Sequence, residues 1–506
     1  MTRPIGRPSG FLLAALSASL LFAAGEPLGV GLVAWVALVP LAVAAFRERS
    51  AGWTAVYALF FGLVYFGVHL HWIFLFGWMA WSALTLVMAL YMTVGVFVGS
   101  VASRLTARGR IFAPLLFAGA WTGAELLRDR WPFGGYPWGA VGTTQGSVPG
   151  VRWLAGVVGV YGLSFLVVLF SALIAWAIVR KEFAWTSVIY ATLVVAIFMG
   201  VDLIGYGTPP QGKPLRMGVI QGNVPRPPIA GQNQIVLRNH LNLTKELLSD
   251  EGPVDVVVWP ESSVANRAMT SGLESVRELA DETNTPFLVG RSFFTSEAYF
   301  NRVEHVTAEG ELDGHYLKRH PVPFGEYVPL GFLRNAVGTL QSEIPVDQVR
   351  GTNATVFDVE GSSIAPPICF ESVFPRDFLD YARNGAELFV IFTNNTSFER
   401  SYAAQQHIAH ARLRALETRQ WVVQAALAGI SGVMGPDGSV SSTTDLFDRE
   451  AFVAEVGVRS AQSLYAKTGD LFPSIWAGLA GAAFLFVIAN RDRKLGRREV
   501  GGQRPR

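Results

Sequence analysis

The feature that most constrains the fold of this chain is a run of 53 residues, Ala51–Ser103, that contains no Asp, Glu, Lys or Arg. A helix needs about 20 mostly apolar residues to cross the hydrocarbon core of a bilayer. The sequence contains eight runs that approach this length and composition: Phe11–Ala24, Gly29–Phe46, Thr54–Phe76, Trp81–Ser103, Ile111–Leu127, Val151–Val179, Ala184–Ile204 and Leu471–Asn490. The sequence therefore predicts a multispan α-helical membrane stem of about eight transmembrane helices.

The first of these runs has a second interpretation. Arg3 and Arg7 precede it and small residues follow it, which is also the pattern of a cleaved signal peptide. Because another apolar run begins soon afterwards, we interpret the first run as a retained span.

Charged residues are concentrated in one part of the chain. Residues 211–459 contain 51 of the 80 charged side chains and have a net charge of −9, whereas the remainder has a net charge of +11. This division predicts a transmembrane domain with spans one to seven over residues 1–210, a soluble domain over residues 211–468, and a last span with a basic tail over residues 469–506. The overall charge of +2 is too small to indicate a nucleic-acid partner.

The basic residues between the runs indicate the orientation in the membrane. Lys and Arg are enriched in cytoplasmic connections. With the N-terminus in the cytoplasm, the basic connections all fall on the inner side, at Arg47/Arg49, Arg104/Arg108/Arg110, Arg180/Lys181 and the tail Arg491–Arg506. The same alternation places residues 211–470 outside, between spans seven and eight.

An aromatic loop lies between the fifth and sixth runs. Residues 131–139 read Trp-Pro-Phe-Gly-Gly-Tyr-Pro-Trp-Gly and include Tyr136 and Trp138. This composition is typical of an interfacial aromatic belt, and it also suits a loop at the membrane surface that shapes a lipid entrance. His69 and His71 lie near the end of the third run, and their closeness to the outer interface favours a structural over a functional role.

The soluble segment alternates short apolar strands with helices. Strands are predicted at Arg216–Gln221, Val254–Trp259, Pro286–Gly290, Ser363–Cys369, Leu388–Thr393 and Gln420–Ala425, with hairpins at Asn301–Lys318 and Gly429–Val440. Helices are predicted at Asn233–Ser249, Gly272–Thr283, Pro375–Asn384 and Ala403–Thr418. This alternation predicts an α/β domain with a sheet covered on both faces.

Three predicted strand ends carry residues that could do chemistry. Glu261 follows the strand Val254–Trp259, Lys318 ends a hairpin, and Cys369 ends the strand Ser363–Cys369. Active sites of α/β proteins usually form at this edge of a sheet. Taken singly, each residue has an ordinary interpretation: a solvated or capping Glu, a surface Lys, and a Cys that acts as a small hydrophobe. Cys369 is the only cysteine, which excludes an intrachain disulfide and argues against a thiolate zinc site.

Taken together and in this order, the three segments resemble the nitrilase superfamily, whose site is Glu-Lys-Cys. The matching runs are Trp259–Glu261, Lys318 with Pro323–Glu326, and Cys369–Glu371. Such a domain inserted before the last span of a multispan membrane protein is similar to the apolipoprotein N-acyltransferase family. The similarity extends to Gly135–Trp138, Gln221–Pro225 and Ala411–Glu417. It implies an αββα sandwich outside the cytoplasmic (inner) membrane of a bacterium.

The resemblance also implies an activity. Cys369 would attack the acyl ester of a phospholipid and form a thioester, with Glu261 as the general base. Lys318 and the backbone N–H of Phe370 would stabilise the oxyanion. The free α-amino group of a diacylglyceryl-cysteine apolipoprotein would then take the acyl chain, in a ping-pong reaction without cofactor or metal. The implied enzyme is a monomer whose other partners are membrane lipids.

Further residues receive roles from the same resemblance. Glu326 and Glu371 would support the site by holding Lys318 and orienting the amine. The expected substrate contacts are Tyr136, Trp138, Phe324, Tyr327 and Asn394. The chain departs from the family pattern at Asn394–Glu399, where an aromatic residue found in many members is missing, and this leaves donor and acceptor preference open.

Two other functions fit parts of the sequence. A membrane-anchored nitrilase-type amidase that hydrolyses a small amide would share Glu261, Lys318 and Cys369, but would not need the aromatic loop or seven preceding spans. A transporter with a regulatory extracytoplasmic domain would need charged residues inside its spans, and Ala51–Ser103 has none.

Overall fold

The computed structural model describes residues 6–105, 109–181, 212–225, 228–266, 272–336, 346–461 and 463–501, with a few isolated positions between 185 and 196. The chain forms two compact units, one of Met1–Tyr206 with Thr468–Arg506 and the other of Gly207–Lys467. The seventh predicted span, Ala184–Ile204, lies outside the described residues apart from those isolated positions.

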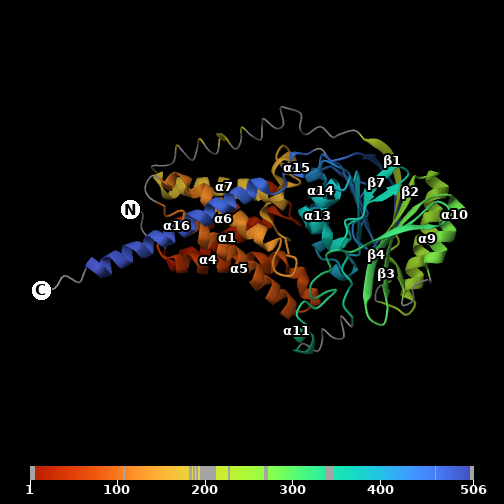
Figure 1. Ribbon diagram of the computed structural model, residues 1–506, viewed down its shortest axis with the longest axis horizontal. Coiled ribbons are helices and arrows are strands. Elements are labelled where there is room, and N and C mark those ends of the chain that lie inside the picture. The colour runs from red at the N-terminus through yellow and green to blue at the C-terminus, as the bar shows by residue number, and fades with distance from the viewer. Residues whose placement is uncertain are drawn as a thin grey trace. The chain divides into compact units, whose positions relative to one another are not determined.

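The first unit is built from apolar helices that run side by side (Figure 1). They are α1 (Arg7–Ala24), α2 (Ala34–Ala37), α3 (Val39–Arg47), α4 (Ala51–His69), α5 (Trp78–Ala102), α6 (Ala113–Arg128), α7 (Ala155–Val179) and α16 (Leu471–Gly501). Within the described part of the chain, five helical segments are long and apolar enough to cross a membrane: α1, α4, α5, Arg152–Val179 and Leu471–Asn490.

Three of the other expectations for the spans need correction. The second predicted span is divided into α2 and α3, because Pro40 lacks the N–H that would continue α2. The third predicted span ends at His69, and a 3-10 helix, His71–Phe76, follows it. The fifth is a helix, α6, but its 16 residues are fewer than the roughly 20 that a straight crossing needs.

Small residues let the helices of this unit approach closely. A Cβ atom at Gly62 of α4 would lie 2.6 Å from the Cα of Ala89 in α5. A Cβ at Gly119 of α6 would lie 2.4 Å from the backbone oxygen of Trp476 in α16. Since lipid offers no hydrophobic drive for helix association, close backbone packing of this kind holds such bundles together.

The second unit contains two six-stranded sheets. The first has the order β12-β1-β2-β3-β4-β5, with β1 (Lys213–Gln221), β2 (Val256–Asn266), β3 (Phe287–Phe294), β4 (Tyr299–Val306), β5 (Leu312–Leu317) and β12 (Glu450–Val458). The second has the order β11-β10-β9-β8-β7-β6, with β6 (Phe357–Val359), β7 (Ser362–Ala365), β8 (Leu388–Thr393), β9 (Val422–Ala426), β10 (Gly432–Met434) and β11 (Val440–Ser441). In each sheet three neighbouring strands are parallel: β1-β2-β3 and β7-β8-β9.

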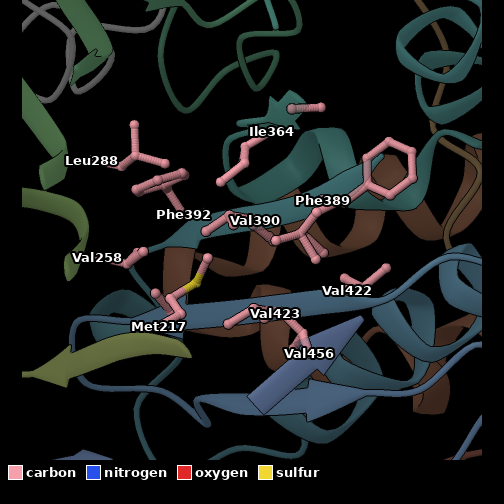
Figure 2. Packing of buried hydrophobic residues seen from close by; sticks show 14 of the residues in the cluster. Met217, Val258, Leu288, Ile364, Phe389, Val390, Phe392, Val422, Val423 and Val456 are labelled. Carbon is pink, nitrogen blue, oxygen red and sulfur yellow. The ribbon is translucent and has the colours of Figure 1, made fainter. Parts of the chain in front are cut away.

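Alternating side chains of these strands fill two different layers. Met217, Val258 and Leu288 of the first sheet pack with Val390 and Val423 of the second in one buried cluster between the sheets (Figure 2). Neighbouring residues such as Val257 and Trp259 point the other way, into a cluster beneath α9 (Gln232–Glu251) and α10 (Leu273–Thr283). Because successive side chains of a strand face opposite sides of the sheet, a continuous apolar run serves both layers.

The outer face of the second sheet is covered by α13 (Pro375–Arg383) and α14 (Ala403–Thr418), on the opposite side of the unit from α9 and α10 (Figure 1). The unit also contains the short helices α11 (Gly331–Ala336) and α15 (Leu464–Thr468). The layers are helix, sheet, sheet, helix, so the predicted fold class is confirmed. Strands β6 and β12 were not expected from the sequence.

Candidate active site

Glu261 lies on a bulge of the central strand β2. The pairing of β2 with β3 shifts register between Trp259 and Val264, and Ser262 has a left-handed φ of 61°. The bulge fits because the opposite residue is a glycine: a Cβ atom on Gly290 would lie 2.2 Å from the oxygen of Pro260 and 2.6 Å from the Cα of Glu261. Bulges often change the direction of a side chain near an active site, and the absence of a Cβ atom at Gly290 leaves room for this one.

The carboxylate of Glu261 is buried and accepts two hydrogen bonds. Asn301 Nδ2 donates to Oε1 at 2.6 Å, and the backbone N–H of Asn394 donates to Oε2 at 2.7 Å. Burial raises the pKa of Glu261, the charge of Lys318 and the two hydrogen bonds oppose this rise, and the charge of Glu326 adds to it. The net pKa is above the ordinary value of a glutamate, which suits a group that takes up and returns a proton.

Lys318 follows β5 directly and is completely buried. Its backbone N–H donates to the oxygen of Asn301, so the residue is still held at the edge of β4. Its Nζ lies 2.7 Å from Glu326 Oε1 and 3.5 Å from Glu261 Oε1. Burial alone would lower the pKa of Lys318, but Glu326 and Glu261 outweigh this and hold the pKa well above its usual value. Lys318 is therefore a fixed cation.

The sequence predicts that Cys369 ends a strand, but the structure shows that it does not. Strand β7 stops at Ala365, and Cys369 begins a short 3-10 helix, Cys369–Val373, with a left-handed φ of 50°. Burial, with a contribution from the charge of Glu261, raises the pKa of the Cys369 thiol to about 12, although Lys318 and a hydrogen bond with Thr393 oppose the rise. The thiol is thus protonated at neutral pH and needs a base before it can act as a nucleophile.

The two carboxylates that are expected to support the site, Glu326 and Glu371, form hydrogen bonds with different groups. Glu326 contacts Lys318 directly, and its second oxygen accepts from the backbone N–H of Val322 at 2.8 Å. In the described part of the chain, Glu371 forms no hydrogen bond or ion pair with the Lys318 side chain. It accepts instead from Tyr316 Oη and from the backbone N–H groups of Arg319, His320 and Ile368.

The expected substrate contacts are spread over both units. In the second unit, Phe324 is 42% exposed with a φ of 61°, and its N–H donates to the oxygen of Tyr327. Phe370 is buried next to Cys369. In the first unit, Tyr136 and Trp138 stack on each other with ring centroids 6.3 Å apart, and Trp138 is buried. His69 in the same unit is buried and stacks on Tyr65.

Three residues that the sequence did not single out contact this constellation. Asn301 donates to Glu261, Thr393 hydrogen-bonds the Cys369 thiol, and His407 lies 3.1 Å from the Cys369 backbone oxygen. Each is a common polar residue inside a predicted strand or helix, so no local pattern distinguishes it. In the part of the chain that the structure describes, no three His, Cys, Asp or Glu residues are grouped so as to hold a metal ion.

A buried Glu-Lys pair lies beside a partly buried cysteine in a two-sheet α/β sandwich. These are the groups that a hydrolase or transferase with a thiol nucleophile would need. Residues 217–466 match the carbon-nitrogen hydrolase family model, and residues 17–173 match the model of the apolipoprotein N-acyltransferase N-terminal domain.

Three bacterial relatives are described as apolipoprotein N-acyltransferases. The chain is 30% identical over 96% of its length to an apolipoprotein N-acyltransferase of Geobacter metallireducens, of which 96% is covered. It is 29% identical to that of Methylococcus capsulatus over 97% of this chain and 99% of the relative, and 32% identical to that of Pseudomonas aeruginosa over 77% and 76%. The chain belongs to the apolipoprotein N-acyltransferase family.

Proposed function

We propose that this membrane protein transfers an acyl chain from a phospholipid to the N-terminal α-amino group of a diacylglyceryl-cysteine apolipoprotein, through a thioester on Cys369. The observation that carries the proposal is the meeting of three groups in one buried site. Lys318 Nζ lies 3.5 Å from Glu261 Oε1, and both charges act on the Cys369 thiol. These groups are a base, a fixed cation and a nucleophile.

In the first half-reaction the Cys369 sulfur attacks the ester carbonyl of the phospholipid while Glu261 takes the thiol proton. A base is required because the pKa of the thiol is about 12. Lys318 and the backbone N–H of Phe370 stabilise the oxyanion that forms. When the oxyanion collapses, the C–O bond breaks, Glu261 returns the proton to the leaving lysophospholipid, and the acyl group remains on sulfur.

In the second half-reaction the neutral α-amino group of the apolipoprotein attacks the thioester carbonyl. Glu261 takes one amine proton, and the same two donors stabilise the second oxyanion. Collapse breaks the C–S bond and forms the amide, and the proton passes from Glu261 to the departing sulfur of Cys369. Glu326 holds Lys318 in place through its 2.7 Å contact, and Glu371 supports the backbone of the segments that carry Lys318 and Cys369.

The remaining assignments follow from the charge pattern and the family. We assign residues 1–210 and 469–506 to the membrane domain and residues 211–468 to the catalytic domain. The basic connections support a cytoplasmic N-terminus and tail, and therefore a catalytic domain outside the inner membrane. Tyr136, Trp138, Phe324, Tyr327 and Asn394 are proposed to contact the lipid substrates.

The decisive experiment is acyl labelling of the purified, full-length protein. Incubation with a phospholipid that carries a radiolabelled acyl chain should give a labelled protein that hydroxylamine releases, as expected of a thioester. Cys369→Ala should remain unlabelled while inserting normally into membranes. Label on Cys369→Ala would refute the assignment of the nucleophile.

The competing function is an amidase that hydrolyses a small amide at the same three residues. The full-length family relatives and the matched N-terminal domain favour the acyltransferase. A wild-type protein that releases ammonia from small amides and never acquires acyl label would favour the amidase instead.

A further inference from the structure

His407 lies directly behind Cys369 and has no part in the mechanism above. It belongs to α14 and is 1% exposed. Its Nε2 lies 3.1 Å from the backbone oxygen of Cys369 and 2.7 Å from Ser372 Oγ. Its Nδ1 lies 3.2 Å from Asn395 Oδ1 and 3.4 Å from Thr393 Oγ1. Both ring nitrogens therefore face the segments that carry the nucleophile and the end of β8.

The contact with the Cys369 oxygen favours one tautomer of the His407 ring. Burial lowers the pKa of His407 to about 4, so the ring is neutral at neutral pH and only one nitrogen carries a proton. A carbonyl oxygen can only accept a hydrogen bond, so the 3.1 Å contact is favourable when Nε2 is the protonated atom.

The environment of the other ring nitrogen fits the same tautomer. An unprotonated Nδ1 can accept from the Thr393 hydroxyl or from the Asn395 amide. As placed, the Asn395 Nδ2 has no hydrogen-bond partner within the described residues. Turning this amide over would put Nδ2 where Oδ1 now lies, 3.2 Å from Nδ1. The protein thus offers a donor to Nδ1 and an acceptor to Nε2.

Holding the Cys369 oxygen has a consequence for the neighbouring N–H. The C=O of Cys369 and the N–H of Phe370 belong to one planar peptide unit and point in opposite directions. The left-handed φ of 50° at Cys369 is unfavourable for a residue with a Cβ atom and must be maintained by its surroundings. His407 supplies a hydrogen bond from the rear of this peptide unit.

We propose that His407 is a positioning residue that holds the Cys369–Phe370 peptide unit so that the Phe370 N–H faces the oxyanion. This inference rests on the proposed thioester mechanism. His407 touches neither substrate nor the reacting atoms; it acts through the peptide unit. Both half-reactions pass through an oxyanion on the same carbonyl carbon, so His407 is needed for both, and it contributes to rate and not to substrate binding.

Two isosteric variants of the full-length protein test the proposal. The amide nitrogen of Gln can take the place of Nε2, and that of Asn the place of Nδ1. We expect His407→Gln to keep the single-turnover rate of Cys369 acylation within about threefold of wild type, and His407→Asn to lower it by about 10- to 100-fold with KM for phospholipid unchanged. His410→Gln, a buried histidine one turn later in α14, is the matched control and should leave the rate unchanged.

Alkylation by iodoacetamide distinguishes an effect of His407 on the peptide unit from an effect on the reactivity of the Cys369 thiol. Cys369 is the only cysteine, so alkylation reports on it alone, and displacement of iodide forms no oxyanion. The alkylation rate of His407→Asn should therefore stay within about threefold of wild type while acylation falls.

Three results would overturn the inference. Equal acylation by the Gln and Asn variants would show that the bond to the Cys369 oxygen is not what His407 supplies. A parallel loss of alkylation would show that His407 acts on the thiol. A wild-type protein that alkylates normally but never forms an acyl-enzyme would overturn the proposed function itself and this inference with it.

Discussion

At the scale of single residues, the site combines a loss of solvation with neighbouring charges and hydrogen bonds that offset this loss only in part. Glu261 and Lys318 are buried and Cys369 is partly buried, and this loss of solvation by itself opposes charge on each of them. The charges of Glu261 and Glu326 keep Lys318 ionised, while the thiol, without enough positive charge nearby, stays protonated. In the proposed mechanism, the thiol therefore stays protonated until a substrate carbonyl is close enough for proton transfer and attack to occur together.

Glu326 makes this balance testable through pH. Its charge raises the pKa of Glu261, so Glu326→Gln should lower that pKa. Because Glu261 acts in its ionised form, the acidic limb of kcat/KM should move to lower pH. The same substitution removes the main charge that raises the pKa of Lys318, so the alkaline limb should also move to lower pH. A pH profile of single-turnover acylation measures both limbs.

The control for this measurement is Glu311→Gln, which removes an exposed carboxylate paired with Arg277 on the surface. Its profile should match that of wild type, since screening by solvent makes such a distant charge ineffective. An acidic limb that stays in place or moves to higher pH in Glu326→Gln would contradict the electrostatic account.

At the scale of elements, one buried carboxylate joins the segments that carry two catalytic candidates. Glu371 accepts from the N–H of Arg319 and of His320, just after Lys318, and from the N–H of Ile368, just before Cys369. Tyr316 Oη donates to both of its oxygens at 2.8 Å. The end of β5 and the start of the 3-10 helix are therefore joined by hydrogen bonds from backbone N–H groups to the Glu371 carboxylate, and not by strand pairing.

Glu371→Gln should separate these segments. The amide keeps one accepting oxygen but presents N–H groups to backbone donors, which leaves buried donors unsatisfied at a cost of roughly 2–4 kcal/mol in unfolding free energy. Acylation should fall together with stability, since both Lys318 and Cys369 lose support. Denaturant unfolding of the purified protein, followed with acylation on the same preparation, measures both effects.

Glu387→Gln is the matched control for Glu371→Gln. Glu387 is partly buried and accepts from the Ser363 N–H at 3.2 Å. Its substitution should cost less than about 1 kcal/mol. Equal effects of the two substitutions would argue that Glu371 has no special role in joining the two segments.

At the scale of the whole molecule, the chain divides its charges between two environments. The net charge is −9 over residues 211–459 and +11 over the rest. This division suits an acidic domain on the outer side of the membrane and basic connections on its cytoplasmic side. Each unit has its own interior: a helix bundle packed on small residues, and a sandwich packed between two sheets.

Cysteine accessibility tests this arrangement in the cell. In a Cys369→Ser background, which has no other thiol, Asp281→Cys lies on an exposed position of the second unit and Arg49→Cys on an exposed position between α3 and α4. A membrane-impermeant maleimide should label Asp281→Cys in intact spheroplasts and Arg49→Cys only after permeabilisation. The reverse pattern would invert the proposed topology.

The sequence by itself determined the division into an apolar stem and an acidic α/β domain, because hydropathy, charge and strand-helix alternation are properties of local runs. It also singled out Glu261, Lys318 and Cys369 as candidate site residues, because they stand in recognisable motifs. Only the tertiary structure decided how these residues are held. Asn394 meets Glu261 across 133 residues of sequence, and His407 meets Cys369 across 38. Such contacts depend on sheet register, bulges and one left-handed backbone angle, none of which leaves a local pattern.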